Sequence, residues 1–487
     1  MVDNLARAVD NSSLGIQIAP ASVKWCSVSL SEMISRDKRL EASVFDVEAK
    51  QAHDVIQQNK FGCIQLLGEK GIIENAYYPG RFKRIYCDKG NGEPFLLPSQ
   101  MADINPKPEK WISRLTKCDI SELRLKEKSM LLTRSGTIGT IAFVSKTIKG
   151  AVFSDDVIRI TFKKVIDLGY TYTFLKSKIG NKVLTTNGYG SVITHLEPEH
   201  LKNVSIPNAP IEIKEKIHNL IVHSYKLRDE SNDLIDEATK LLIDELHLPD
   251  ISVFKNYTAS VETFGVKLSK INGRIDASYH LPIVDAITAH LRKYAAEVTT
   301  VGDKRISNTI ILPGRFKRVY VDEKYGRALL GGKQIGELCP SVEKYLSVNK
   351  HNKRIKEQLE IRQNTILITR SGTIGKTAFV PKHWENCVAS EHIIRVIPSS
   401  EDIAGYLYIF LASEYGHQLI TRFTYGSVVD EIDDTHVSQI AVPLLKNKEI
   451  QSQINALALA ANEKRYEAYK LEQQALTIMD EKVIFAK

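Results

Sequence analysis

The chain has 487 residues, of which 43% are hydrophobic and 25% charged, and a formal net charge of +8. One hydrophobic core does not normally serve such a length, so two or more domains are expected. No apolar run reaches the roughly 18 residues of a membrane-spanning helix, and the N-terminus lacks the basic start and apolar stretch of a secretion signal. We therefore expect a cytoplasmic globular protein, whose mild positive charge permits a polyanionic partner.

The cysteines are isolated from one another in the sequence. No C-x-x-C pair occurs, which argues against a zinc site, and scattered single cysteines are typical of a reducing cytoplasm. They are Cys26, Cys63, Cys87, Cys118, Cys339 and Cys387. We therefore predict no metal ion on this chain.

A unit of about 235 residues occurs twice along the chain, far longer than the period of a solenoid repeat. RLEAS at 39–43 matches RIDAS at 274–278, YPGRFKRIYCD at 78–88 matches LPGRFKRVYVD at 312–322, TRSGTIG occurs at 133–139 and at 369–375, and YGSV occurs at 189–192 and at 425–428. The nearly constant offset predicts a tandem duplication. Residues 1–38, which match nothing later, are predicted to be an N-terminal extension, and 247–273 to be a linker with the start of the second copy.

Each copy is predicted to contain a β-rich domain followed by a long helix. Short β-forming segments such as RIYCD, TIAFV and DDVIRITF are bounded by Gly, Pro, Ser and Asn, which is typical of short strands. The helical pattern starts after Pro207 in the first copy and after Pro443 in the second. The predicted boundaries are 39–207 and 274–443 for the domains, and 208–246 and 444–487 for the helices.

The two predicted helices carry heptad seams that need a partner helix. The seams run through Ile213, Ile217, Leu220, Ser224, Leu227, Ser231, Leu234, Ala238 and Leu241, and through Ile450, Ile454, Leu457, Ala461, Lys464, Ala468, Leu471, Ala475 and Ile478. We predict that the helices pair with each other and run antiparallel, because two units related by a two-fold axis send them in opposite directions. Leu220, Leu227, Leu234, Leu457, Leu471 and Ile478 are expected to be buried between them. The alternative is that each helix lies on its own domain.

The predicted fold class is therefore α+β: a pseudo-two-fold tandem duplication with two β-rich domains separated by two long antiparallel helices. The segment GRFKR, at 80–84 and 314–318, sets three cations around one aromatic residue in each domain. Arg and Lys contact phosphates and guanine edges, so we predict DNA contacts by Arg81, Lys83, Arg84, Arg315, Lys317 and Arg318. The alternative is a solvated basic strand that resists edge aggregation.

Two further repeated segments are candidates for contact with DNA. TRSGTIG follows an apolar strand, and its glycines suit a tight turn or a bulge. The candidates are Arg134, Ser135 and Thr137 in the first copy and Arg370, Ser371 and Thr373 in the second; the alternative is a demanding turn alone. YGSV offers a phenol and a hydroxyl for phosphate oxygens, through Tyr189, Ser191, Tyr425 and Ser427, or else forms a turn into the helical part. The matched His200 and His436 are expected to start helices or to pack.

Motifs of catalysis are missing from the sequence. There is no glycine-rich cofactor loop with an Asn/Asp-Pro-Pro-aromatic loop, as a DNA methyltransferase needs, and no G-x-x-x-x-G-K-[ST] phosphate loop. Neither H-E-x-x-H nor G-x-S-x-G occurs. We predict no catalytic residue and no cofactor on this chain.

The paired PGRFKR, TRSGTIG and YGSV segments, each followed by a heptad helix, resemble the specificity subunit of type I restriction–modification systems, a host-defence family. The resemblance implies that the β-rich parts are target recognition domains that read a bipartite target in double-stranded DNA. It also implies that the helices are conserved regions and that the subunit is not an enzyme. The expected partners are two methyltransferase subunits, which bind S-adenosylmethionine, and through them restriction subunits, which use ATP and Mg²⁺. The alternatives are a stand-alone DNA-modifying enzyme or nuclease, or a protein-binding scaffold.

Overall fold

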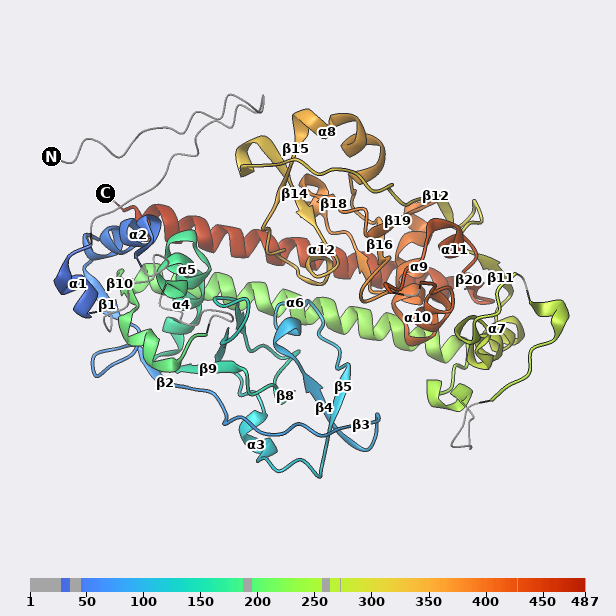
Figure 1. Ribbon diagram of the computed structural model, residues 1–487, viewed down its shortest axis with the longest axis horizontal. Helices are drawn as coiled ribbons and strands as arrows, with labels where there is room; N and C mark the ends of the chain where they lie inside the picture. The colour runs from blue at the N-terminus through green and yellow to red at the C-terminus, as the bar shows by residue number, and fades with distance from the viewer. Residues whose placement is uncertain are drawn as a thin grey trace, which may run out of the picture.

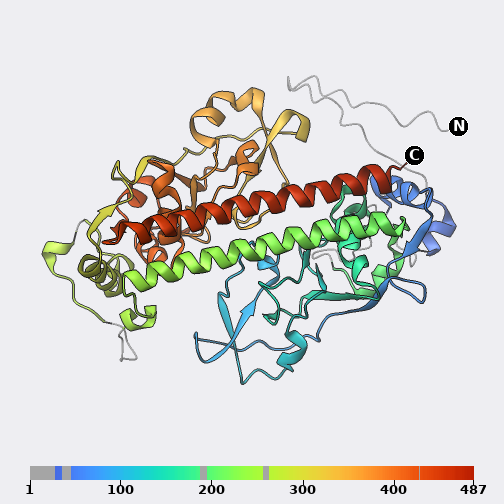
Figure 2. The same cartoon turned by 180° about the vertical axis from the view of Figure 1, so that it is seen from behind.

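The computed structural model describes residues 28–35, 45–186, 195–255, 263–271, 273–426 and 428–486. Most of the predicted N-terminal extension lies outside these ranges. Figure 1 shows two long helices, α6 (Ile211–Glu245) and α12 (Lys448–Met479), side by side along the whole molecule, with one β-rich domain on either side of the pair. Figure 2 gives the same arrangement from behind. The predicted fold class is confirmed.

The two domains have the same topology, strand for strand. One four-stranded sheet has the order β2-β9-β6-β7 in the first domain and β12-β19-β16-β17 in the second. The bounds are β2 (Ile73–Tyr77), β6 (Met130–Thr133), β7 (Ile141–Phe143) and β9 (Val157–Phe162), then β12 (Ser307–Ile311), β16 (Ile366–Thr369), β17 (Thr377–Phe379) and β19 (Ile393–Pro398). All neighbours in these sheets pair antiparallel. The central strands β6 and β16 are fully buried, so the domain core lies here.

A second four-stranded sheet follows the order β3-β5-β4-β8 in the first domain and β13-β15-β14-β18 in the second. Its strands are β3 (Tyr86–Cys87), β4 (Gly92–Leu96), β5 (Lys110–Ser113) and β8 (Val152–Phe153), then β13 (Tyr320–Val321), β14 (Gly326–Leu330), β15 (Tyr345–Ser347) and β18 (Val388–Ala389). A two-stranded sheet closes each domain next to its long helix, from β1 (Cys63–Gln65) with β10 (Ser205–Pro207) and from β11 (Glu297–Thr300) with β20 (Ala441–Leu444).

The shorter helices are α1 (Leu30–Ser35), α2 (Val47–Gln57), α3 (Ile120–Leu123), α4 (Val165–Lys176) and α5 (Lys178–Thr185), then α7 (Pro282–Tyr294), α8 (Val348–Arg354), α9 (Glu401–Ala412), α10 (Glu414–Thr421) and α11 (Asp434–Ser438). Of these, α2, α4 and α5 in the first copy correspond to α7, α9 and α10 in the second. Helices α2 and α7 each precede the first strand of a domain, so the structural repeat includes a helix at its start. Helices α4 and α9, almost entirely buried, pack each domain onto the long helices.

The pair of long helices, called the separator below, is antiparallel. Ser224 Oγ of α6 donates a hydrogen bond to the carbonyl oxygen of Ala468 in α12, at 2.7 Å. Seven residues further along α6, Ser231 accepts a hydrogen bond from Arg465 at 2.9 Å. The contacts thus advance along α6 while they go back along α12, so the two helices run in opposite directions. Small residues at heptad spacing are fully buried along both helices, and small side chains allow close approach: Ser224, Ser231, Ala238, Ala461, Ala468 and Ala475.

One half of the predicted seam is displaced by one residue. Leu227 and Ile478 are buried as expected, but Leu220, Leu234, Leu457 and Leu471 are only half-buried. The neighbouring Ile221, Ile235 and Leu242 are buried in their place. The reason is that each helix packs on two sides, against its partner and against α4 or α9, so its buried stripe is wider than a coiled-coil seam.

A buried cluster of charges lies at the middle of the separator. Arg228 of α6 forms an ion pair with Glu472 of α12, and Lys176 of α4 lies 3.7 Å from the same carboxylate. Burial alone would raise the pKa of Glu472, but the adjacent Arg228 and Lys176 lower it. In the other half of the repeat, Ile235 takes the place of Glu472, so the duplication is asymmetric at this point.

The two domains touch each other beside the separator. Asp103 and Glu337, which occupy equivalent positions in the copies, form an antiparallel bridge, and the N–H of Ile104 donates to the carbonyl of Gly336 at 2.8 Å. Lys376 of the second domain pairs with Asp103 at 3.3 Å. Contact between equivalent residues places the pseudo-two-fold axis at this bridge.

Two exposed ion pairs also join the domains. Lys89 of the first domain lies 3.2 Å from Glu414 of the second, and Lys178 of the first lies 2.9 Å from Glu323 of the second. The pseudo-two-fold exchanges these contacts, since Glu323 is the counterpart of Lys89 and Glu414 that of Lys178. All four side chains are more than half exposed, so each pair contributes little to stability.

Candidate nucleic-acid interface

The GRFKR segments form extended connections between strands, β2 to β3 in the first domain and β12 to β13 in the second. The basic strand of the alternative interpretation is therefore not formed. Their side chains nevertheless alternate: Phe82 and Phe316 are half-buried against the second sheet, and Arg81, Lys83, Arg315 and Lys317 are exposed. The aromatic side chain fixes each segment to its domain and leaves two cations on the surface.

The last arginine of each segment is engaged inside its own domain. Arg84 lies 2.5 Å from Asp155 and also donates to Ser154. Arg318 lies 2.6 Å from Glu391 and also donates to the hydroxyl of Tyr320 at 3.2 Å. The hydrogen bond that Arg318 donates to Glu391 raises the pKa of the Arg318 guanidinium. These two arginines hold the segment against the turn that follows β8 or β18, which favours a framework role for them over contact with phosphate.

The TRSGTIG segments form the same tight turn in both domains. Thr133 Oγ1 donates to the carbonyl of Thr137 at 2.7 Å and accepts the N–H of Thr140 at 3.1 Å. Gly136 and Gly139 have φ of +74° and +84°, which only glycine adopts without strain. A Cβ on Gly139 would also lie 2.6 Å from Thr185. The turn itself therefore explains why this segment is identical in the two copies.

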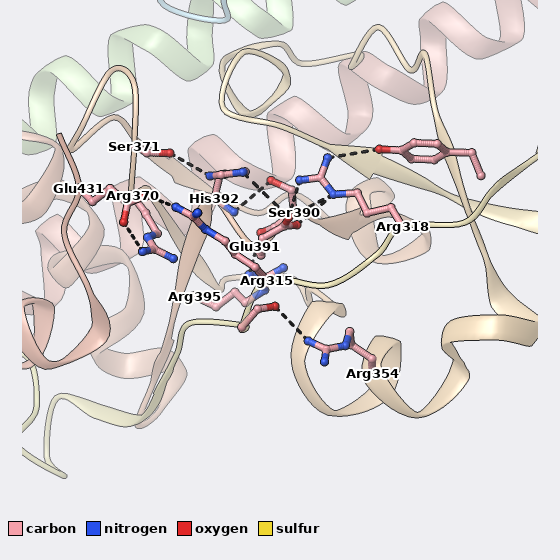
Figure 3. A network of polar contacts seen from close by, with 12 residues as sticks. Arg315, Arg318, Arg354, Arg370, Ser371, Ser390, Glu391, His392, Arg395 and Glu431 are labelled. Atoms are coloured by element: carbon pink, nitrogen blue, oxygen red, sulfur yellow. Dashed lines mark hydrogen bonds and ion pairs between the residues drawn. The ribbon is translucent and has the colours of Figure 1, made fainter. Parts of the chain in front are cut away.

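Arg134 and Arg370, the arginines of this turn, form ion pairs; Arg134 is buried and Arg370 half-buried. Arg134 lies 2.5 Å from Glu197 and 3.3 Å from Asp156, over the ring of Tyr78. Arg370 lies 2.5 Å from Glu431, whose other oxygen lies 2.9 Å from the exposed Arg315. Figure 3 shows this network, in which Glu431 joins the TRSGTIG turn to the GRFKR segment. Both arginines therefore join separate segments of their own domain through these ion pairs.

The serines of the turn are also bonded within the domain. Ser135 donates to Asp156 at 2.7 Å and lies 2.9 Å from His195 Nδ1. Ser371 lies 3.0 Å from His392 Nδ1, a contact that Figure 3 also draws. Thr137 and Thr373 project from the tip of the turn and are exposed. The threonines are therefore the members of this segment that a ligand can reach.

Of the YGSV candidates, Tyr425 alone belongs to the described residues; Tyr189, Ser191 and Ser427 lie outside them. Tyr425 is 39% exposed, and its backbone pairs with Glu431 in an isolated bridge. The matched His200 and His436 accept the N–H of Glu197 and of Asp433 on Nδ1, at 3.1 Å and 3.4 Å. They start short helices, as expected from the sequence.

The exposed cations nearest to these turns are Arg81 and Lys83 in the first domain, and Arg315 and Lys317 in the second. Arg81, Lys83 and Lys317 have no ion pair in the described part of the chain, and Arg315 is 72% exposed despite its contact with Glu431. The predicted DNA contacts thus separate into exposed cations, which can bind phosphate, and buried arginines, which order the segments that carry them.

Sequence reasoning missed a second pair of structural arginines. Arg159 of β9 and its counterpart Arg395 of β19 are buried and donate to backbone carbonyls, among them Phe153 and Ile393. Burial lowers the pKa of Arg159 to about 10 and that of Arg395 to about 9. They join the first sheet to the second one in each domain. Their only signal in the sequence is one arginine inside an apolar strand, in VIRITF and IIRVIP.

The described residues offer no grouping of three or more His, Cys, Asp or Glu side chains that could hold a metal ion. In the same ranges, no helix is both long and apolar enough to cross a membrane.

Comparisons with known proteins point to one family. The family model described as "Type I restriction modification DNA specificity domain" matches residues 80–232 and 331–459, more than half of the chain, once in each copy of the repeat. A search among curated proteins gives no match.

Two solved structures are similar to this chain at low identity. The type I restriction-modification S subunit from M. genitalium is 13% identical, with a TM-score of 0.30, over 86% of this chain and 97% of that one. The HsdS subunit from Thermoanaerobacter tengcongensis is 14% identical, with a TM-score of 0.25, over 85% of this chain and 98% of that one. These scores are low, so the assignment rests on the match to the specificity domain.

Proposed function

The chain belongs to the family of type I restriction modification DNA specificity domains, and from this premise we propose that it is a non-catalytic subunit that reads a bipartite target in double-stranded DNA. Each β-rich domain, 39–207 and 274–443, would read one half of the target. The subunit would recruit two methyltransferase subunits to the DNA and, through them, restriction subunits. S-adenosylmethionine would be bound by the methyltransferase, and ATP with Mg²⁺ by the restriction subunit, in the cytoplasm.

The observation that carries the proposal is the pseudo-two-fold arrangement of two specificity domains on one rigid separator. Domains related by a two-fold axis suit two half-sites in opposite orientation, and the distance between the domains fixes the spacing of those half-sites. Arg81 and Lys83 in the first domain and their counterparts in the second supply cations for phosphates next to each half-site. The bases themselves would be read by residues that differ between the copies.

The separator would then act as a ruler for the unread bases between the half-sites. Ser231 of α6 and Arg465 of α12 lie at the same level, so seven residues inserted after each would preserve both heptads. The rod would lengthen by about 10 Å, at about 1.5 Å per residue. At about 3.4 Å per base pair, the spacer in the target would grow by about three base pairs. The contact of Asp103 with Lys376 would have to break.

The test uses the full chain assembled with its methyltransferase subunit and maps the methylated sequences. We expect methylation at one bipartite sequence, dependent on both proteins, and a spacer about three base pairs longer for the lengthened chain, with both half-sites unchanged. Methyl transfer by the purified chain alone would overturn the non-catalytic role. An unchanged spacer in a folded lengthened chain would refute the ruler.

A further inference from the structure

The two domains differ most in shape directly after β5 and β15. In the first domain this segment holds only the four-residue α3, which is capped by Asp119 and contains Glu122. In the second domain it holds α8, which is kinked at His351 and then runs directly into a π-helical turn, Ile355–Leu359. Figure 1 places α8 at the outer end of the second domain, away from the separator. The second domain thus has a surface helix that the first lacks.

The exposed side of this helix carries a stripe of amide and ammonium groups. The stripe consists of Asn349, which precedes the kink at His351, and of Asn352, Lys353 and Lys356, which follow it. All four are exposed, and in the described part of the chain none of their side chains has a hydrogen bond or an ion pair. The exposed Glu357 directly follows Lys356, and no apolar side chain is exposed between residues 349 and 357.

The opposite side of the helix is fixed to the domain. Ile355 and Leu359 are fully buried against β14 and β15. His351 Nε2 accepts the N–H of Val319 at 3.1 Å, and the Arg354 guanidinium lies over the ring of Phe316, 4.7 Å from its centre.

Arg354 also donates to the carbonyl of Gly314 at 3.1 Å, which Figure 3 shows beside Arg315 and Arg318. Helix and GRFKR segment therefore form one rigid unit. The side of the helix opposite to the amide stripe makes these contacts, so the helix is ordered before any ligand arrives.

We propose that the helix 348–359 lies in the major groove and reads bases of the half-site that belongs to the second domain. This inference rests on the proposed function and specifies which element of the domain selects the sequence. The major groove, about 12 Å wide, admits one α-helix. Asn pairs with the N6 and N7 edge of adenine and Lys with O6 and N7 of guanine, so the stripe has the chemistry of direct readout. Lys317, next to the helix, then binds phosphate and fixes the position of the helix along the DNA.

The segment after β5 in the first domain differs from the segment after β15 in its charged groups as well as in its shape. The segment of the first domain exposes acidic groups, Asp119 and Glu122, and Arg124 is bound to Glu93 at 2.9 Å and to the carbonyl of Gly150. Carboxylates next to DNA repel phosphate. Arg114 and Lys117 are also exposed in this segment, but it forms no helix comparable to α8, so a change in α8 affects only one half of the target.

The experiment selects bound sequences from a randomised duplex library with the full chain assembled with its methyltransferase subunit. The test variant combines Asn349→Ala, Asn352→Ala and Lys353→Ala, all exposed positions, and its thermal midpoint confirms folding. We expect preference in one half-site to fall by about 10-fold for each contacted base pair, with the other half-site and the spacer unchanged. The variant Lys317→Ala should weaken binding to all sequences alike, and Lys240→Ala on the separator should change nothing.

Each result decides between the possibilities. A folded triple variant that selects both half-sites as wild type does, or that loses both equally, overturns the inference and leaves the proposed function standing. A triple variant that selects the wild-type DNA sequences but loses the methyltransferase from the complex would show that the stripe binds protein instead. That result would also overturn the inference. A wild-type complex that selects no sequence refutes the proposed function itself.

Discussion

Salt dependence of DNA binding tests the division between exposed and buried cations. The variant replaces Arg81, Lys83, Arg315 and Lys317 by alanine. Three of these contact no acidic side chain in the described ranges, and Arg315 is partly neutralised by Glu431. We therefore expect the loss of about three phosphate contacts. Each phosphate contact contributes about 0.9 to the slope of log affinity against log salt, so the slope should fall by about 2.7.

That difference is large enough to measure directly. Between 50 and 200 mM salt, the wild-type complex should lose about 40-fold more affinity than the variant. The assay is fluorescence anisotropy of a labelled duplex across a salt series, with the chain assembled with its methyltransferase subunit. A matched control removes four exposed lysines of the separator, Lys216, Lys226, Lys240 and Lys470.

The control should keep the wild-type slope, because the cations that bind phosphate are placed on the domains. If the folded domain variant binds with an unchanged slope, the GRFKR cations do not touch phosphate. A reduced slope in the control would place phosphate contacts on the separator instead.

Three further predictions concern stability, each measured by denaturant unfolding. Glu472→Gln leaves Arg228 buried without its counter-ion and should lower the free energy of unfolding by about 3–5 kcal/mol; a loss below 1 kcal/mol would contradict the buried pair. Ile221→Ala should cost about 2–5 kcal/mol and Leu220→Ala clearly less, because only Ile221 is fully buried; the reverse order would support a seam through Leu220. Burial lowers the pKa of His383 to about 4. The unfolded chain therefore binds a proton at this histidine at a higher pH than the folded chain does, and the free energy of unfolding should fall as the pH drops from about 6.5 to 4. In His383→Gln this part of the pH dependence should disappear, and its persistence would assign it to other groups.

The duplication, the fold class and the antiparallel separator could be predicted from the sequence because they follow from a repeat over the whole chain. The phase of the seam could not. A heptad pattern identifies the residues that repeat, but Leu220 and Leu234 lie at the margin of a stripe that two neighbours cover. Which of two adjacent apolar residues points inward depends on α4 and α9, and these come from other parts of the chain.

The candidate site was predictable only as a list of cations. Arg84 and Arg134 look as available in the sequence as Arg81 does, yet each is paired with a carboxylate more than 60 residues away, Asp155 or Glu197. Such pairs depend on strand order, which the sequence does not display. The helix α8 was missed for a different reason. The repeat reveals only the segments that both copies share, and this helix belongs to one copy alone.

The two exposed ion pairs between the domains bear on how a duplicated chain becomes asymmetric. The first domain supplies both lysines, Lys89 and Lys178, and the second supplies both glutamates, Glu323 and Glu414. A chain built from two copies of the first domain would set lysine against lysine at both contacts, and two copies of the second would set glutamate against glutamate. Each contact is weak, but both favour the same unlike pairing. The halves have diverged into complementary partners, and both contacts favour the pairing of unlike halves over that of two identical ones.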